Sequence, residues 1–248
     1  MRAITLIVLF ISSILFTRAE IHTLPIGQFD KIKISGNLTV VYKNLPDSTG
    51  LARYEAPAGN SQLFKMDVNK NGLLKISPGD DSWTEKDLPV LYVYSDFLSS
   101  VESYSEKDVQ ISGLIPTAIF KVNLIGNGSI YVDDIKSTEV SASLSTGNGS
   151  IYLTGSCEEA NFKMIGTGLI SADQLQADNV KCHILGTGSI GCWPIDNLKV
   201  SGLGSTKIYY KGSPNISKKG GGKLYELPKE DVGTGGAELR SLNPSVHR

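Results

Sequence analysis

The sequence predicts an all-β protein built as a single-stranded parallel β-helix, or β-solenoid, with coils of about 20 residues. Three observations predict it. A Gly-x-Gly motif recurs at a nearly constant interval, and short runs of alternating apolar and polar residues flank each copy. In addition, the chain holds 26 glycines in 248 residues without a three-residue period, which excludes collagen. An irregular N-terminal β-region is expected ahead of the repeats.

The chain begins with the features of a secretory signal peptide, expected to span residues 1–19. A basic residue, Arg2, precedes an apolar run over residues 4–16, and Thr17-Arg18-Ala19 supplies small residues at the two positions that a signal peptidase reads. The run is shorter than the about 20 residues that a membrane span needs. A retained anchor is the alternative. We therefore expect an exported protein in the periplasm, at the cell surface or in the medium, without a membrane span after cleavage.

Residues 20–100 lack the glycine motif but still alternate in the manner of strands. Turn-forming residues separate the alternating runs, for example Ser35-Gly36-Asn37. The runs are Ile32/Ile34, Leu38/Val40/Tyr42, Phe64/Met66/Val68, Leu74/Ile76 and Leu91/Val93. An open solenoid end would expose a sheet edge and the core, so this region is expected to cap the solenoid or to continue it irregularly.

Residues 101–227 carry the repeats. The four clear motifs begin about 20 residues apart, at Gly126, Gly147, Gly166 and Gly186. Each is followed by an isoleucine at an equivalent place, and the column continues weakly downstream: Ile130, Ile151, Ile170, Ile190 and Ile208. Alternation before and after each motif predicts one repeat as strand, Gly-x-Gly corner, strand and polar turn.

Stacking explains both the repeat and its glycines. A unit of 20 residues cannot enclose its own apolar side, but successive units laid about 4.8 Å apart can. The chain must turn sharply between close neighbours, which suits a residue that has no Cβ and tolerates positive φ. The middle residues then stack, Asn127 over Asn148 and Thr167 over Thr187. A leucine-rich repeat is disfavoured because its consensus is absent from this sequence, and an antiparallel sandwich would not explain the regular glycine motif.

Composition excludes several kinds of partner. A formal net charge of −1 argues against nucleic-acid binding. With three His and three Cys, we expect no metal site and no cofactor. The odd number of cysteines favours buried small side chains over a disulfide scaffold, and the sequence leaves open whether any pair forms among Cys157, Cys182 and Cys192. Residues 228–248 have no periodicity and are expected to form a flexible tail.

No catalytic residue is expected. A polysaccharide lyase or hydrolase on a β-helix would need clustered carboxylates, and the candidates are Asp133, Asp134 and Asp173. Asp133 and Asp173 share a repeat position about 9–10 Å apart, with Thr154 on the rung between them. Aspartates at strand ends are, however, common turn residues. His183 falls in an outward row without a patterned nucleophile, which indicates a solvated side chain.

The candidate ligand contacts are an aromatic row, Tyr131, Tyr152 and Tyr209, predicted to share one outward position. Exposed tyrosines can stack on sugar rings or anchor a protein. Two other interpretations remain open: an aromatic pair that stabilises the sheet, and the contact of a homo-oligomer. The same interpretations remain open for Trp193, which is expected at the end of a strand.

A family resemblance follows from two motifs. The segment Phe29-Asp30-Lys31-Ile32-Lys33-Ile34-Ser35-Gly36, followed by Leu38, Val40 and Tyr42, precedes repeated Gly-[Asn/Thr]-Gly-Ser-Ile units. Over about residues 28–227 the chain resembles the "putative auto-transporter adhesin, head GIN domain" family of exported proteins common in Bacteroidetes. The resemblance implies a right-handed β-helix with an adhesive or surface-binding role and without an established enzyme activity.

Together these features predict an exported, non-enzymatic β-solenoid that acts as an adhesin or surface-binding module. Its flat faces would recognise a carbohydrate or a cell-surface protein. A carbohydrate-active enzyme is the first alternative, and a structural envelope protein that self-associates is the second.

Overall fold

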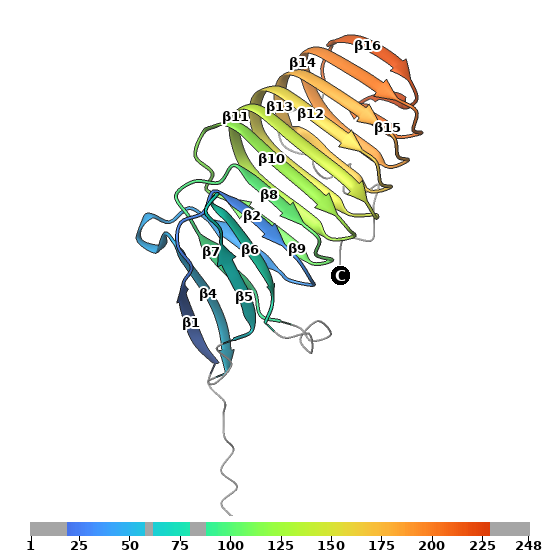
Figure 1. Ribbon diagram of the computed structural model, residues 1–248. Coiled ribbons are helices and arrows are strands. Elements are labelled where there is room, and N and C mark those ends of the chain that lie inside the picture. Colours follow the sequence, from blue (N-terminus) through green and yellow to red (C-terminus); the bar gives the residue numbers. More distant parts are fainter. Residues whose placement is uncertain (1–18, 58–61, 80–87, 229–248) are drawn as a thin grey trace, which may run out of the picture.

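The computed structural model describes residues 19–57, 62–79 and 88–228 (Figure 1). Apart from its last residue, the expected signal peptide lies outside the described residues, and so does the expected tail beyond residue 228. In the described part every element is a strand except one short 3-10 helix, Pro46–Ser48. No described segment forms a helix that is long and apolar enough to span a bilayer.

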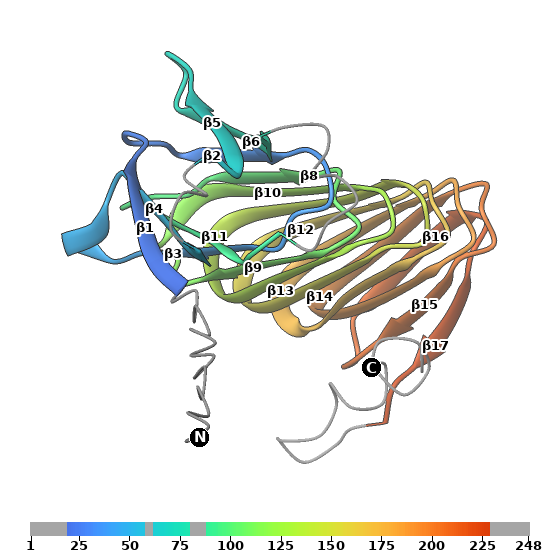
Figure 2. The same ribbon diagram turned by 90° about the horizontal axis from the view of Figure 1, so that it is seen from below.

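The chain winds into a stack of coils with two faces (Figures 1 and 2). Four long strands each contribute to both faces, because they bend midway: β11 (Ser129–Thr146), β12 (Ser150–Met164), β13 (Leu169–Ile184) and β14 (Ser189–Gly202). Their first parts lie on one face, called face B. Their second parts lie on the other, called face A. Along these four strands all pairing is parallel, as in a β-solenoid.

Shorter strands extend both faces. Face A runs in the order β5 (Phe64–Val68), β6 (Leu73–Pro78), β2 (Lys31–Ile34), β8 (Ser100–Ser103), β10 (Thr117–Ile125), then β11–β14 and β16 (Asn215–Gly220). Face B runs in the order β1 (Ala19–Pro25), β4 (Leu51–Pro57), β7 (Leu91–Tyr94), β3 (Val40–Lys43), β9 (Asp108–Ser112), then β11–β14, β15 (Lys207–Tyr210) and β17 (Lys223–Glu226).

One interior column confirms the predicted architecture. Its members are paired rung by rung in parallel register, and none has accessible surface: Ile130, Ile151, Ile170, Ile190 and Ile208. The other inward positions also fill the core, from Phe162 on face A to Val109 on face B. The alternation of apolar and polar residues therefore specifies the inside and outside of each strand, as period-two patterning requires.

Close approach of successive coils explains the glycine motifs. A Cβ on Gly168 would lie 1.8 Å from the carbonyl oxygen of Gly149, and one on Gly188 would lie 2.0 Å from that of Gly168. Among the eight glycines of the four clear motifs, only Gly126 and Gly147 have positive φ. The missing side chain, more than the unusual backbone angle, is thus the common requirement. Of the middle residues, the Asn127 side-chain oxygen accepts a hydrogen bond from the backbone N–H of Asn148 at 3.0 Å.

The N-terminal region contributes coils out of sequence order. The coil formed by β2 and β3 lies between the coil of β6 and β7 and that of β8 and β9. Beyond them, β1 pairs with β4, and β5 pairs with β6, in antiparallel fashion. Antiparallel strands thus end both faces on this side of the solenoid. At the other end, every residue of β16 is exposed, and Lys218 and Lys219 provide charge on that edge.

Candidate functional site

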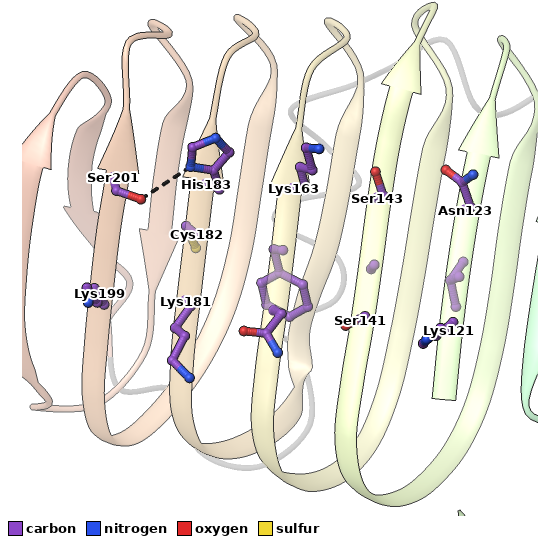
Figure 3. A pocket seen from close by; sticks show the side chains of 14 residues that line it. Lys121, Asn123, Ser141, Ser143, Lys163, Lys181, Cys182, His183, Lys199 and Ser201 are labelled. Atoms are coloured by element: carbon purple, nitrogen blue, oxygen red, sulfur yellow. Dashed lines mark hydrogen bonds between the residues drawn. The ribbon is translucent and has the colours of Figure 1, made fainter. Parts of the chain in front are cut away.

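An open pocket of about 610 Å³ lies on the outer surface of face A, across β10 to β14 (Figure 3). We call it the face A pocket. Its outward-pointing lining residues are Lys121, Asn123, Ser141, Ser143, Asn161, Lys163, Lys181, His183, Lys199 and Ser201. The inward-pointing residues between them, such as Phe162, belong to the core. The pocket is therefore a hollow lined by side chains with polar or charged ends, on a sheet whose reverse side is apolar.

Strand register places these side chains in two rows. One row joins Lys121, Ser141, Asn161, Lys181 and Lys199, and the other joins Asn123, Ser143, Lys163, His183 and Ser201. Neighbours within a row stand on successive strands, about 4.8 Å apart. The rows exist because the two positions lie two residues apart on every strand, so both point away from the core.

The charge of the face A pocket is one-sided. None of its 14 lining residues is Asp or Glu. The Lys181 ammonium pairs with Glu159 at 2.7 Å, whereas the other three lysines make no ion pair with any carboxylate of the described residues. The imidazole Nδ1 of His183 lies 3.3 Å from the hydroxyl of Ser201. The hollow therefore presents positive charge and neutral hydrogen-bonding groups.

Glutamates lie just beyond the pocket and accept hydrogen bonds from neighbouring side chains. The amide nitrogen of Asn161 donates to Glu139 at 3.0 Å, and that of Asn179 donates to Glu159 at 2.9 Å. Glu139 also accepts a hydrogen bond from the Ser141 hydroxyl, so both carboxylates reach the row that contains Lys121, Lys181 and Lys199. Only Lys181 shares one of these carboxylates.

An apolar rim borders the face A pocket at the glycine corners. It consists of Ile165, Leu185 and Leu203, each of which directly precedes the first glycine of a motif copy. These residues are 38%, 49% and 88% exposed, respectively. Lys163 and His183 stand two residues before the first two of them, so polar and apolar outward positions lie next to each other.

The aromatic row on face B is divided into two pairs. Tyr131 stacks on Tyr152 with ring centroids 4.8 Å apart and ring planes at 4°, and Tyr209 stacks on Tyr225 at 5.3 Å. Ser171 and Gly191 occupy the two strands between the pairs. Tyr152 is only 7% exposed, so little of its ring surface is open to a ligand. The sequence prediction missed Tyr225, although it directly follows Gly220-Gly221-Gly222-Lys223-Leu224 just as Tyr152 follows Gly147-Asn148-Gly149-Ser150-Ile151.

The carboxylates considered for catalysis have different environments. Asp173 is fully buried: it accepts a hydrogen bond from the Ser171 hydroxyl at 2.8 Å and lies 3.7 Å from the Lys211 ammonium. Asp133, by contrast, is exposed. The register pairs Thr154 with Gln174, because a bulge shifts Asp173 out of the shared repeat position.

Structural roles account for the remaining candidates. Asp134 has φ of 54°, donates its backbone N–H to the Thr154 hydroxyl and pairs with Lys136, as a turn residue does. Trp193 packs under the Lys211 ammonium, which lies 5.5 Å from the ring centroid. Among the described residues, no group of three or more His, Cys, Asp or Glu is placed to hold a metal ion.

The three cysteines are buried and free. Burial raises the pKa of the Cys157 thiol to about 12, with further contributions from Asp178 and Glu159. A hydrogen bond with Cys182, together with burial, raises the pKa of the Cys192 thiol well above its ordinary value. The Cys157 and Cys192 thiols are thus protonated at neutral pH, and burial shields all three cysteines, which suits packing and opposes nucleophilic chemistry.

Comparisons with solved structures show the same fold. A "putative adhesin" from Bacteroides fragilis NCTC 9343 has a TM-score of 0.72 and 21% sequence identity, covering 85% of this chain and 97% of that one. A "putative lipid binding protein" from Parabacteroides distasonis ATCC 8503 has a TM-score of 0.66 and 22% identity, with the same two coverages. A "putative adhesin" from Parabacteroides merdae ATCC 43184 has a TM-score of 0.67 and 20% identity, again covering 85% and 97%.

Sequence comparison identifies the family. None of the curated proteins compared with the chain matches it. Residues 28–214, however, match the family model described as "putative auto-transporter adhesin, head GIN domain". This match covers most of the solenoid and confirms the resemblance drawn from the glycine motifs and the segment at Phe29. The chain belongs to the "putative auto-transporter adhesin, head GIN domain" family.

Proposed function

We propose that this protein is an exported, non-enzymatic binding module that attaches to a carbohydrate or a protein of a cell surface through face A. The observation that carries the proposal is the face A pocket, a hollow with polar and cationic side chains in two aligned rows. The strands beneath it are held in register by parallel pairing on both sides. A preformed surface of this kind loses little conformational entropy when it binds.

Two features support the non-enzymatic part of the proposal. Asp173, the buried candidate, is already engaged by Ser171 and Lys211, whereas Asp133 stands in solvent. A general acid and base would need a common substrate between them. The lining of the face A pocket, for its part, offers lysines, amides, hydroxyls and His183 but no carboxylate.

Export is proposed from the signal-peptide features of residues 1–19 and agrees with the family description as an adhesin. The similar solved structures carry the descriptions adhesin and lipid binding protein. Both descriptions name binding rather than turnover. They support a binding role for this chain without naming its ligand.

A matched pair of tryptophan substitutions tests the proposal. Ser143→Trp places a bulky ring in the face A pocket on β11, and Gln110→Trp places the same bulk on the exposed surface of β9 on face B. The purified chain and both variants are applied to a glycan array and to intact bacterial and epithelial cells. Far-UV circular dichroism and light scattering check that fold and assembly state are unchanged.

The proposal expects the unsubstituted chain to bind, Ser143→Trp to lose that binding and Gln110→Trp to keep it. Equal binding by all three chains would overturn the role of face A. Turnover of a polysaccharide that disappears in Asp133→Ala would instead establish the enzymatic alternative. Self-association with blank arrays and cells would favour a structural envelope protein.

A further inference from the structure

We infer that the face A pocket takes a linear anionic polysaccharide, laid along the solenoid axis with its acidic groups on the lysines. The inference rests on the proposed function and specifies the chemical class of its ligand. Three properties of the pocket carry it: the sign of its charge, the spacing of the charges and the kind of groups between them.

The sign of the charge is the first property. The whole chain has a formal net charge of −1, yet the described lining of the face A pocket holds four lysines and no carboxylate. Lys121, Lys163 and Lys199 make no ion pair with a carboxylate of the described residues. A local concentration of unpaired positive charge attracts an anionic ligand even when the molecule as a whole is slightly negative.

The spacing of the charges is the second property. Lys121 stands on β10, Lys163 on β12, Lys181 on β13 and Lys199 on β14. Four steps of about 4.8 Å separate β10 from β14, so the cations extend over about 19 Å of the axis. A single phosphate or carboxylate can reach one or two of them. A ligand that engages them all must be extended and must carry several negative groups in sequence.

The groups between the lysines are the third property. Asn123, Ser143, Asn161 and Ser201 can exchange hydrogen bonds with the hydroxyl groups that a polysaccharide presents along its length, and Ser141, whose own hydroxyl donates to Glu139, can accept from them. A single-stranded nucleic acid is also an extended polyanion, but its bases need aromatic platforms. Among the described residues that line the pocket, Phe162 is the only aromatic one besides His183, and it is buried in the core.

An anionic membrane fits this surface less well. A bilayer is flat and contacts the residues that protrude, whereas these lysines line a hollow. The apolar rim of Ile165, Leu185 and Leu203 stands to one side, next to the row that contains Lys163 and His183. The row with Lys121, Lys181 and Lys199 lies farther from that rim. We therefore commit to the polysaccharide and treat vesicle binding as an outcome of the test.

The test uses the full chain with polygalacturonate, a linear polymer that carries one carboxylate per sugar. Neutral dextran and vesicles with and without phosphatidylglycerol serve as comparison probes. The variants are Lys163→Gln, Lys199→Gln and their combination. Lys207→Gln combined with Lys223→Gln removes the same charge from exposed positions of face B and is the matched control. Affinities are measured by titration calorimetry at low and high salt.

Polygalacturonate is expected to bind and dextran to bind much more weakly. Each single substitution should lower the affinity about twofold to fivefold, and the combination about fourfold to 25-fold, since each lost contact is a solvent-exposed charge pair. The affinity of the unsubstituted chain should fall with added salt, and less steeply in the combined variant. The face B control should bind as the unsubstituted chain does.

Three results would overturn the inference: no binding of polygalacturonate, binding that is equal in the combined variant and the unsubstituted chain, or lysine-dependent binding of anionic vesicles without binding of the polymer. The proposed function fails separately. If the lysine variants change nothing while Ser143→Trp still abolishes binding to a neutral glycan or a protein, the binding role of face A stands and only the polyanion is wrong.

Discussion

The substitution Gly168→Ala examines the stacking of the coils directly. A Cβ at this position would lie 1.8 Å from the carbonyl oxygen of Gly149, a distance below 3.0 Å that real Cβ atoms essentially never show. The two coils would have to separate by about 1 Å or more at this corner. The hydrogen bond from the Leu169 N–H to the same oxygen, now 3.0 Å long, would then be lost.

The expected cost follows from these contacts. One lost backbone hydrogen bond with a buried partner costs about 1–2 kcal/mol, and the overpacking strain adds about 1–3 kcal/mol. Gly168→Ala should therefore lower the free energy of unfolding by about 2–5 kcal/mol. Gly27→Ala is the matched control, because Gly27 has φ of +85° and no heavy atom within 4 Å of the added Cβ. Backbone strain alone should cost this control about 1–2 kcal/mol.

Urea unfolding followed by circular dichroism measures both changes as shifts of the midpoint at a common slope. Hydrogen exchange adds a local readout, since the Leu169 amide should lose protection in Gly168→Ala and keep it in Gly27→Ala. A midpoint for Gly168→Ala equal to or above that of Gly27→Ala would refute the reasoning. In that case the coils would not touch at the glycine corners, and another cause would be needed for the motif.

Three further predictions concern the core and two titrating groups. Phe162→Ala should lower the free energy of unfolding by about 3–5 kcal/mol in the same urea assay, because its ring fills the core between the two faces. Burial raises the pKa of Glu102, but hydrogen bonds from Lys33, Tyr104 and Asn123 outweigh it and leave the pKa below 4.5. Glu102→Gln should therefore cost about 0.5–1 kcal/mol at neutral pH. That difference should vanish as the pH falls from 4.5 through the lower folded pKa, measured by urea unfolding across a pH series. Burial raises the pKa of Cys157 from 9.0 to about 12, so its contribution to stability is complete below pH 9 and is lost as the pH rises towards 12. A thiol reagent at pH 8 should accordingly modify the cysteines only after denaturation, whereas rapid labelling of the native chain would contradict their burial.

The solenoid was predictable because its signal is local and repeated. The interval between the glycine motifs predicted the length of one coil. The alternation around Ile130 and its equivalents predicted which side of each strand faces the core. The order of the first coils was not predictable in this way. The coil of β2 and β3 lies between two coils formed by later residues. Nothing in the spacing of residues 31–43 indicates which distant segments will pair with them.

The candidate site was visible in part. The outward rows with Lys121, Lys163 and Lys199 follow from the alternation, but the sequence does not show that they border a hollow. The sequence predicted that Tyr131, Tyr152 and Tyr209 share one position of the repeat, and the strand register confirms it. The low exposure of Tyr152, however, depends on the packing around it. Asp173 does not occupy its expected register because a bulge interrupts the pairing of β12 with β13. Tyr152 pairs with Ser171, but the next pair joins Thr154 to Gln174.

By itself the sequence determined the winding of the repeat coils and the side of each of their strands that faces inward. Both properties depend on residues that are close in sequence. Successive side chains of a strand point to opposite sides, and a glycine recurs at each corner where successive coils touch. Only the tertiary structure decided which lysines pair with a carboxylate, which aromatic rings are covered and where the outer surface is hollow. These properties depend on groups that are distant along the chain and meet only when the coils are stacked.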